Sequence, residues 1–220
     1  CSQIKPHFLY NTLNTISLLI KCGEKNQAVH DIEKLSFFLR GVMNTDKEIP
    51  LSAELKIVDS YLGLQKSRYA DTLSYQIDLP ESIMSYRIPA LTLQPIVENA
   101  VIHGCELKKG NSIIRIYSVI ADGCLLICIA DNGNGMDNAQ VEELNRSFRI
   151  GSSKDQTKTE NIFTDSIGLN NVNSRLQLKF GNEYGLSISS EIDEGTCASI
   201  RLPLNPKEGE EINVHSDDCR

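Results

Sequence analysis

Polar side chains share one face of an expected helix near the start of the chain. His7, Asn11 and Asn14 are separated by four and three residues, so a helix places them on a common side, apart from its apolar positions. Pro6 is harmless in the first turn of a helix, but deeper inside one it removes a backbone hydrogen bond. A neutral imidazole is a nucleophile, yet a histidine on a helix surface is also common without any function. This segment alone leaves both interpretations open.

A second polar cluster lies in the largely apolar residues 94–104. Glu98, Asn99 and His103 stand out there, and Asn99 and His103 are four residues apart, which places them on one helix face. An asparagine carbonyl oxygen is a hard ligand that suits Mg²⁺, which keeps water and phosphate oxygens as its other ligands. The same side chains could instead form a buried polar network at the end of the helix.

An aspartate and two glycines follow an expected strand. Asp131 at the strand end can accept a hydrogen bond from an exocyclic amine such as that of adenine, which is worth about 1.5–3 kcal/mol. Guanine presents an oxygen at that place and is repelled. Gly133 and Gly135 let the backbone turn sharply or pass close to a ligand, although such a string is often only a turn.

A third glycine marks a possible phosphate site. Gly168 stands where an expected loop enters an expected helix, and the free amides and dipole of a helix N-terminus suit a phosphate. A plain helix start with Ser166 as its cap explains the same residues.

The first 70 residues are expected to be helical. Apolar residues alternate at spacings of three and four, which predicts three helices packed side by side, broken at Gly23 and at Ile49-Pro50. The expected seams are Leu9, Leu13, Ile16 and Ile20, then Ala28, Ile32, Leu35, Leu39 and Val42, then Leu51, Leu55, Val58, Leu62 and Tyr69.

The rest of the chain is expected to be mixed. Alternation predicts a strand at 73–79. Strand-like runs at 113–121 and 124–130 are joined by Asp122-Gly123, a hairpin turn signal, and further strands are expected at 186–192 and 198–204 around Glu194-Gly195. Helices are expected at 89–105, with Pro89 near the start, and at 141–148 and 167–180; residues 149–165 are expected to be a loop. The fold class is therefore α+β: a helical region 1–70, a sheet covered on one face in 71–205, and a polar tail 206–220.

Composition limits the partners and the compartment. The net charge of −7 argues against a nucleic-acid surface, which would need a basic patch. The seven cysteines form no CxxC pair, which favours reduced thiols over a metal site. No apolar run reaches the roughly 18 residues of a transmembrane helix. Because the chain starts at Cys1 within a patterned segment, we expect a fragment of a longer protein.

The four polar segments occur in an order that resembles a known family. Residues 3–14 resemble the phosphoacceptor box of the LytS and YesM type sensor histidine kinases, and residues 94–104 resemble their N box. Residues 131–136 and 167–172 are similar to the two glycine boxes. Smaller matches are Arg175-Leu176 and Gly195-Thr196. The resemblance covers residues 3–204.

The resemblance implies a fold and a site. Residues 75–205 would adopt the α/β-sandwich ATP-binding fold (GHKL or Bergerat type) shared by gyrase, chaperone, mismatch-repair and histidine-kinase ATPases. Asn99 would hold Mg²⁺, Asp131 would read the adenine amine, and residues 137–165 would form a mobile lid. The implied nucleotide-binding residues are Glu98, Asn99, His103, Asp131, Gly133, Gly135, Met136, Gly168 and Leu169.

The implied activity is Mg-ATP-dependent autophosphorylation of His7, followed by transfer to an aspartate of a response regulator. The helical region would form a homodimer, and a missing N-terminal sensor would place this part at the cytoplasmic face of the membrane. Ile102 and Ser166 depart from the family pattern near the expected phosphates, which predicts weaker ATP binding or slower transfer. Phe8 replaces the acid that often follows the histidine, so the base stays open, with Glu98 as one candidate. Two alternatives are an ATPase or serine-directed kinase of the same fold, and a degenerate, non-catalytic dimerisation module.

Overall fold

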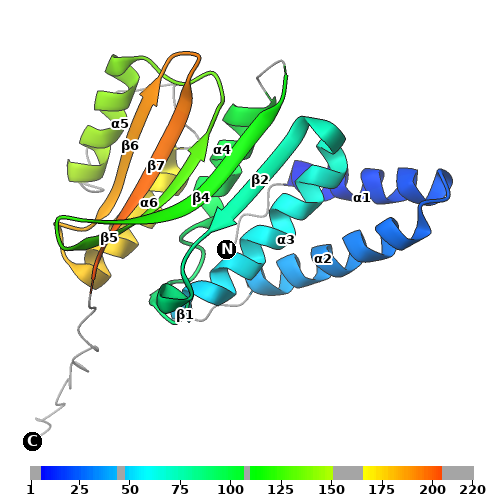
Figure 1. Ribbon diagram of the computed structural model, residues 1–220, viewed down its shortest axis with the longest axis horizontal. Coiled ribbons are helices and arrows are strands. Elements are labelled where there is room, and N and C mark those ends of the chain that lie inside the picture. The colour runs from blue at the N-terminus through cyan, green and yellow to red at the C-terminus, as the bar shows by residue number, and fades with distance from the viewer. Residues whose placement is uncertain (1–5, 44–47, 107–109, 151–165, 205–220) are drawn as a thin grey trace, which may run out of the picture.

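The computed structural model describes residues 6–43, 48–106, 110–150 and 166–204. Figure 1 shows a group of helices formed by the first third of the chain beside a layered body of sheet and helices. The polar tail lies outside the described residues. So do residues 151–165, which make up nearly all of the expected loop and the second half of the expected lid.

Three helices form the first part of the fold. They are α1 (Pro6–Lys21), α2 (Lys25–Met43) and α3 (Leu51–Tyr69), close to the expected ranges. Pro6 is the first residue of α1, which is the harmless position. An aromatic cluster joins the three helices: the Phe8 ring centroid lies 5.1 Å from that of Phe38 and 5.0 Å from that of Tyr61.

The expected seams are only partly right. In α3 the apolar positions from Leu51 to Leu62 are buried as predicted. In α1, however, the buried side chains are Phe8, Thr12 and Ile16, whereas Leu13 is 52% exposed and Ile20 is 51% exposed. The cause is geometric. In a single chain, α2 and α3 cover only one side of α1, and the apolar stripe of α1 is wider than that side.

A five-stranded sheet forms the centre of the second part, in the order β2-β4-β5-β7-β6. Its strands are β2 (Leu73–Asp78), β4 (Ser112–Ala121), β5 (Cys124–Asp131), β6 (Gly185–Glu191) and β7 (Gly195–Pro203). Strand β2 pairs with β4 in parallel, and the other neighbours are antiparallel. Asp122 and Gly123 both have positive φ, 51° and 69°, as the predicted two-residue hairpin turn requires.

Helices cover one face of this sheet. They are α4 (Gln94–Val101), α5 (Asn138–Ile150) and α6 (Ser166–Phe180) (Figure 1). Ile114 and Ile116 of β4 are fully buried toward this layer, whereas Arg115 between them is exposed on the opposite face. This alternation is the half-buried strand pattern seen in the sequence, and it confirms the α+β fold class.

Short elements complete the fold. The sequence did not indicate β1 (Glu48–Pro50), which pairs with β3 (Arg87–Pro89). Pro89 therefore ends a strand, and the predicted helix start there is wrong; α4 begins at Gln94 with Pro95 in its first turn. Single helical turns lie at η1 (Ala70–Thr72) and η2 (Glu81–Ile83), and the π-helical turn η3 (Ile102–Glu106) continues α4. Because α3 also packs against β2 and α4, the division of the chain at residue 70 stays a prediction.

Candidate active site

His7 lies in the first turn of α1 with its imidazole exposed. The side-chain nitrogen of Asn11, one turn later, lies 3.0 Å from Nε2 and 3.2 Å from Nδ1 of the ring, so the amide can donate to an unprotonated ring nitrogen. The next residue, Phe8, points the opposite way into the aromatic cluster and anchors this turn. His7 is therefore held by its neighbours on an exposed face of α1.

Helix α4 presents Glu98 and Asn99 beside a buried apolar face. The Gln94 side chain donates a hydrogen bond of 3.1 Å to Glu98 Oε1. The side-chain amide of Asn99 is half-buried and has no hydrogen-bond partner within the described part of the chain. A carbonyl oxygen with no protein partner is a suitable donor for Mg²⁺, so this residue fits the metal that the sequence suggested.

The π-helical turn brings the end of this helix against the end of β5. His103 is exposed there and Gly104 is buried. A methyl group on Gly104 would lie 3.0 Å from Cβ and 3.2 Å from Oδ1 of Asp131, so a side chain there would push against this carboxylate. π-turns inside helices are frequently found at functional sites.

The turn after β5 is built around the carboxylate of Asp131. Oδ1 accepts a 2.8 Å hydrogen bond from the amide of Gly133, and a side chain on Gly133 would meet the backbone of His103 and Gly104. Asn132 ties the turn to β4, because its Oδ1 accepts the amide of Ile113 at 2.8 Å. The two sequence segments predicted to form the site are therefore in direct contact.

Strands β6 and β7 close the far side of this turn. Thr196 is the direct β-ladder partner of Asp131, and Gly135, with φ of 66°, lies against the backbone of Glu191. The hydroxyl of Ser190 accepts the amide of Met136 at 2.9 Å and lies 2.9 Å from Oγ1 of Thr196. The sequence analysis missed Ser190, although its alternation with Leu186 and Ile188 places it on the covered face of β6.

Gly168 and Leu169 lie in the first turn of α6. Leu169 is buried in the core, and a methyl group on Gly168 would meet no atom of the described residues within 4 Å, so none of them covers the backbone there. In Figure 1, α1 lies to one side of α3 and β5 lies to the other.

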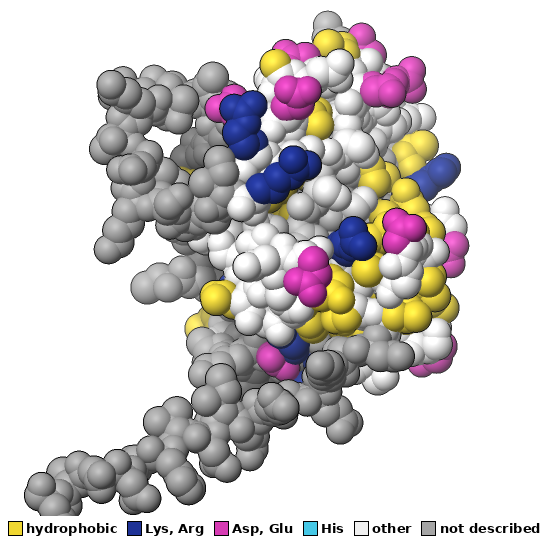
Figure 2. Space-filling view, turned by 90° about the vertical axis from the view of Figure 1, so that its left-hand side faces the viewer, with side chains coloured by type: hydrophobic (Ala, Val, Ile, Leu, Met, Phe, Trp, Pro, Cys, Tyr) yellow, Lys and Arg dark blue, Asp and Glu magenta, His cyan; other side chains and the backbone are white. Residues whose placement is uncertain are grey.

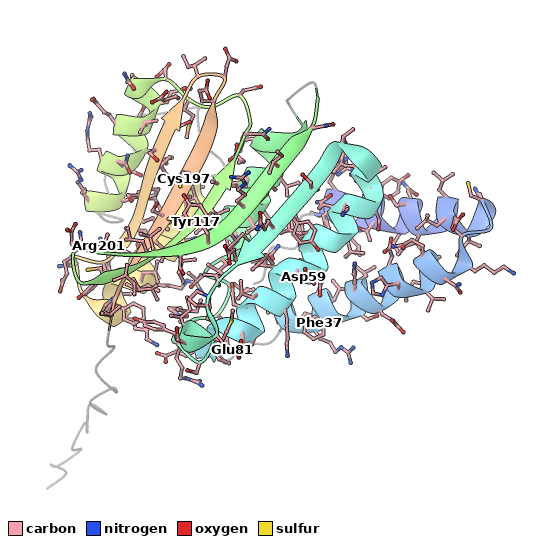
Figure 3. The ribbon with its side chains drawn as sticks, viewed as in Figure 1. Phe37, Asp59, Glu81, Tyr117, Cys197 and Arg201 are labelled. Carbon is pink, nitrogen blue, oxygen red and sulfur yellow. The ribbon has the colours of Figure 1, made fainter. Side chains whose placement is uncertain are left out.

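The outer face of the sheet carries a thiol cluster away from these residues. The hydroxyl of Tyr117 lies 3.9 Å from Sγ of Cys197, and Ser199 lies within hydrogen-bond distance of both Cys197 and Cys128 (Figure 3). The hydrogen bond from Cys128 lowers the pKa of Cys197 to about 6, although burial opposes the shift. Burial raises the pKa of Tyr117 to about 12. Among the described residues these cysteines are free thiols, and no cluster of three or more metal ligands is present there.

Surface charge and shape add little around the site. On the side of the molecule that carries α5, Lys and Arg side chains are interspersed with Asp and Glu (Figure 2). A cleft of about 890 Å³ opens between α2, α3 and the β2–β3 connection, with Phe37, Asp59 and Glu81 in its lining (Figure 3). None of the predicted site residues lines this cleft.

Family models match both parts of the chain. Residues 1–73 match the model described as "Histidine kinase", and residues 87–206 match "Histidine kinase-, DNA gyrase B-, and HSP90-like ATPase". The second match covers more than half of the chain, and its fold is the layered sheet described above. The chain belongs to this family of histidine kinase-, DNA gyrase B- and HSP90-like ATPases.

Three curated relatives are named as sensor proteins. Sensor histidine kinase YesM of Bacillus subtilis is 36% identical over 203 residues, which cover 92% of this chain and 32% of the relative. Sensor histidine kinase BtsS of Escherichia coli is 32% identical over 92% of this chain and 32% of the relative. Sensor protein LytS of Bacillus subtilis is 32% identical over 96% of this chain and 34% of the relative. The chain thus spans about a third of the length of these relatives. Within its described residues no helix is both long and apolar enough to cross a bilayer.

Proposed function

We propose that this chain is the catalytic part of a two-component sensor histidine kinase, which binds Mg-ATP and autophosphorylates on His7. One observation carries the proposal: the end of the α4–η3 helix, the turn after β5 and the start of β7 converge on the carboxylate of Asp131. These three segments are far apart in the sequence, and an ATPase family shares their fold.

The nucleotide is expected to sit at this convergence. Asp131 accepts the exocyclic amine of adenine, and Thr196 across the ladder supplies a hydroxyl beside it. Gly133 and Gly135 let the turn after β5 pack closely against Gly104 and Glu191, while Gly168 leaves the start of α6 free for the phosphates among the described residues. Glu98, His103, Met136 and Leu169 complete the proposed set of contacts.

Asn99, with Glu98 beside it, would hold Mg²⁺, and the ion would neutralise charge on the phosphates during transfer. The neutral imidazole of His7 attacks the γ-phosphorus in line with the bond to the β-phosphate oxygen. The N–P bond forms as that P–O bond breaks, ADP leaves with the electron pair, and the second ring nitrogen loses its proton to a base. Positioning supplies most of the rate in such reactions. Asn11 orients the ring before the reaction, and its hydrogen bond to the unprotonated nitrogen breaks as that nitrogen attacks.

A homodimer explains the apolar surface of the helical part. Leu13 and Ile20 of α1 and Val29, Ile32 and Met43 of α2 are each more than 45% exposed. They form a stripe beside the buried faces of the two helices, and a second copy would cover it in a four-helix bundle. In the same proposal the phosphohistidine is the donor to an aspartate of a response regulator, and a sensor part outside this sequence connects the chain to the cytoplasmic face of a membrane.

The test is an autophosphorylation assay with labelled ATP and Mg²⁺. We expect acid-labile, base-stable phosphate on the wild-type chain and none on His7→Gln, with ATP binding retained in the variant. His30→Gln is the matched control, because His30 is also exposed but lies on α2. Acid-stable phosphate would favour the serine-directed kinase instead, and failure of Mg-ATP to raise the melting temperature would favour the non-catalytic module.

A further inference from the structure

Glu54 is a buried carboxylate in the first turn of α3 that the proposed chemistry does not use. Its relative exposure is 0%, and its two oxygens accept the amides of Leu93 at 2.9 Å and Leu91 at 3.0 Å. The amide of Gln94 lies 3.4 Å from Oε1. Burial raises the pKa of Glu54, while these amides and the nearby Arg175 act against the rise. Burying such a group is costly unless it is hydrogen-bonded, so these contacts fix the positions of both partners.

Two of the three amides belong to the start of α4, those of the N-cap Leu93 and of Gln94, and that of Leu91 lies in the segment just before it. The first amides of a helix have no partner within the helix, and the residue before α4, Leu93, provides no side-chain cap. Glu54 supplies the missing acceptor from another helix, and its charge suits the positive end of the helix dipole. The position and direction of α4 therefore depend on a residue of α3.

Arg175 of α6 holds the same segment from the other side. Its guanidinium donates to the carbonyl oxygens of Ala90 and Leu91, the latter at 2.6 Å. Burial lowers the pKa of Arg175, and Glu54 opposes this effect. Residues 90–94 are thus held between an acid from α3 and a base from α6.

The beginning of α3 is joined to the segment just before α4. The amides of Leu51 and Ser52 donate to the carbonyls of Tyr86 and Met84, at 2.8 and 3.0 Å. Together with the pairing of β1 and β3, these bonds make the first turn of α3 and residues 84–94 one hydrogen-bonded unit.

The same helix reaches the other reactant. Tyr61 lies seven residues after Glu54, about two turns along α3. Its ring packs 5.0 Å from that of Phe8, the residue directly after His7. Helix α3 therefore contacts both the turn that carries the imidazole and the start of the helix that carries Asn99.

We propose that Glu54 is a positioning residue for phosphoryl transfer, which fixes the start of α4, and with it Asn99, relative to the helix that carries His7. The inference rests on the proposed function. It assigns to α3 the task of setting the geometry between the metal-binding helix and the phosphoacceptor helix.

Glu54→Gln tests the inference, because it keeps the size of the side chain and removes its charge. We expect the rate of His7 phosphorylation at saturating Mg-ATP to fall about tenfold or more, since hydrogen bonds to a charged acceptor are lost. The affinity for ATP in EDTA should stay within about twofold, because Glu54 does not contact the turn after β5. The tightening of ATP binding by added Mg²⁺ should be reduced, and the amides of Leu91 and Leu93 should exchange faster with deuterium.

Controls separate positioning from folding. Glu81→Gln changes an exposed acid in η2 and should leave all readouts unchanged. Glu54→Asp keeps the charge with a shorter reach and should recover part of the rate. A wild-type rate in Glu54→Gln would overturn the inference. The inference would also be overturned if Glu54→Gln lost ATP affinity and phosphorylation rate in parallel, and circular dichroism showed that a smaller folded fraction accounts for both losses.

The experiment also distinguishes the two proposals. If the wild-type chain forms no phosphohistidine, the proposed function fails. In that case two readouts still test the inference: the exchange of the Leu91 and Leu93 amides, and the Mg²⁺ dependence of ATP binding. If both are the same in Glu54→Gln and wild type, the inference fails as well. If both change, Glu54 still positions α4 for the metal.

Discussion

Thr196 lies directly across the β5–β7 ladder from Asp131, so a hydroxyl and a carboxylate emerge side by side at the end of the sheet. The turn after β5 orients this carboxylate through the amide of Gly133 at 2.8 Å. The pair faces the point where the α4–η3 helix ends, and the predictions that concern the nucleotide start from it.

Asp131→Asn should weaken ATP binding by about 10- to 150-fold, which corresponds to the 1.5–3 kcal/mol of a hydrogen bond to a charged group. Asparagine keeps the shape but loses the charge that favours the adenine amine. Titration calorimetry measures the change. Asp193→Asn, at the exposed β6–β7 turn, is the matched control and should bind ATP as the wild type does. Unchanged affinity of the Asp131 variant would remove this residue from the adenine role.

Gly133→Ala should lower the melting temperature. The new methyl carbon would lie 2.6 Å from Cα of Gly104 and 2.9 Å from the carbonyl oxygen of His103, and backbone atoms cannot rotate away. Overpacking of this kind costs about 1–3 kcal/mol, or roughly 2–4 °C for each kcal/mol in a chain of this size. Gly168→Ala has open space and should not lower the melting temperature. Equal melting temperatures for the Gly133 variant and wild type would contradict the tight contact.

Asn11→Ala should slow autophosphorylation about two- to tenfold, because one hydrogen bond worth about 0.5–1.5 kcal/mol no longer orients the imidazole. Initial rates at saturating Mg-ATP give the effect. Asn14→Ala removes an exposed amide from the same helix face and serves as the control. If both variants react at the wild-type rate, the contact between Asn11 and His7 has no role in the transfer.

Cys197 should react with iodoacetamide at mildly acidic pH. Its pKa of about 6 means that the thiolate, which is the reactive form, increases as pH rises through 6 and reaches a plateau near neutrality. Mass spectrometry of the labelled peptide between pH 5 and 8 measures the profile, and Cys197→Ser removes the label. Cys128→Ala removes the hydrogen bond that lowers the pKa of Cys197, so the midpoint of the labelling profile should move to higher pH. A midpoint that stays in place would assign the shift to other groups.

Local patterns predicted most of the elements well. Alternation at the start of β4 and the apolar run of β5 indicated these two strands, because Ile114 and Ile116 of β4 are buried against helices and most of β5 is buried on both faces. Asp122 and Gly123 gave the turn between them, because few residues adopt positive φ. The polar segments around Asn99 and Asp131 were recognised as a site for a similar reason, since such residues are unusual in apolar surroundings.

Other features depended on partners that no local pattern identifies. Strand β1 is three residues long and exists because it pairs with β3, almost forty residues later. That pairing also places Pro89 in a strand and moves the helix start to Gln94. Leu13 looked like a seam residue, and only the packing of α2 and α3 against Phe8 showed that it faces outward in a single chain.

The sequence by itself determined the class of fold, the polar segments of the site and the exposed face that carries His7, because periodicity and residue type act over one or two turns or strands. Only the tertiary structure decided that Gly104 meets Asp131, that Thr196 stands opposite it, and that Glu54 caps a helix forty residues away. The physical reason is that the role of a buried carboxylate or of a glycine depends on the atoms packed against it, and those atoms come from distant parts of the chain.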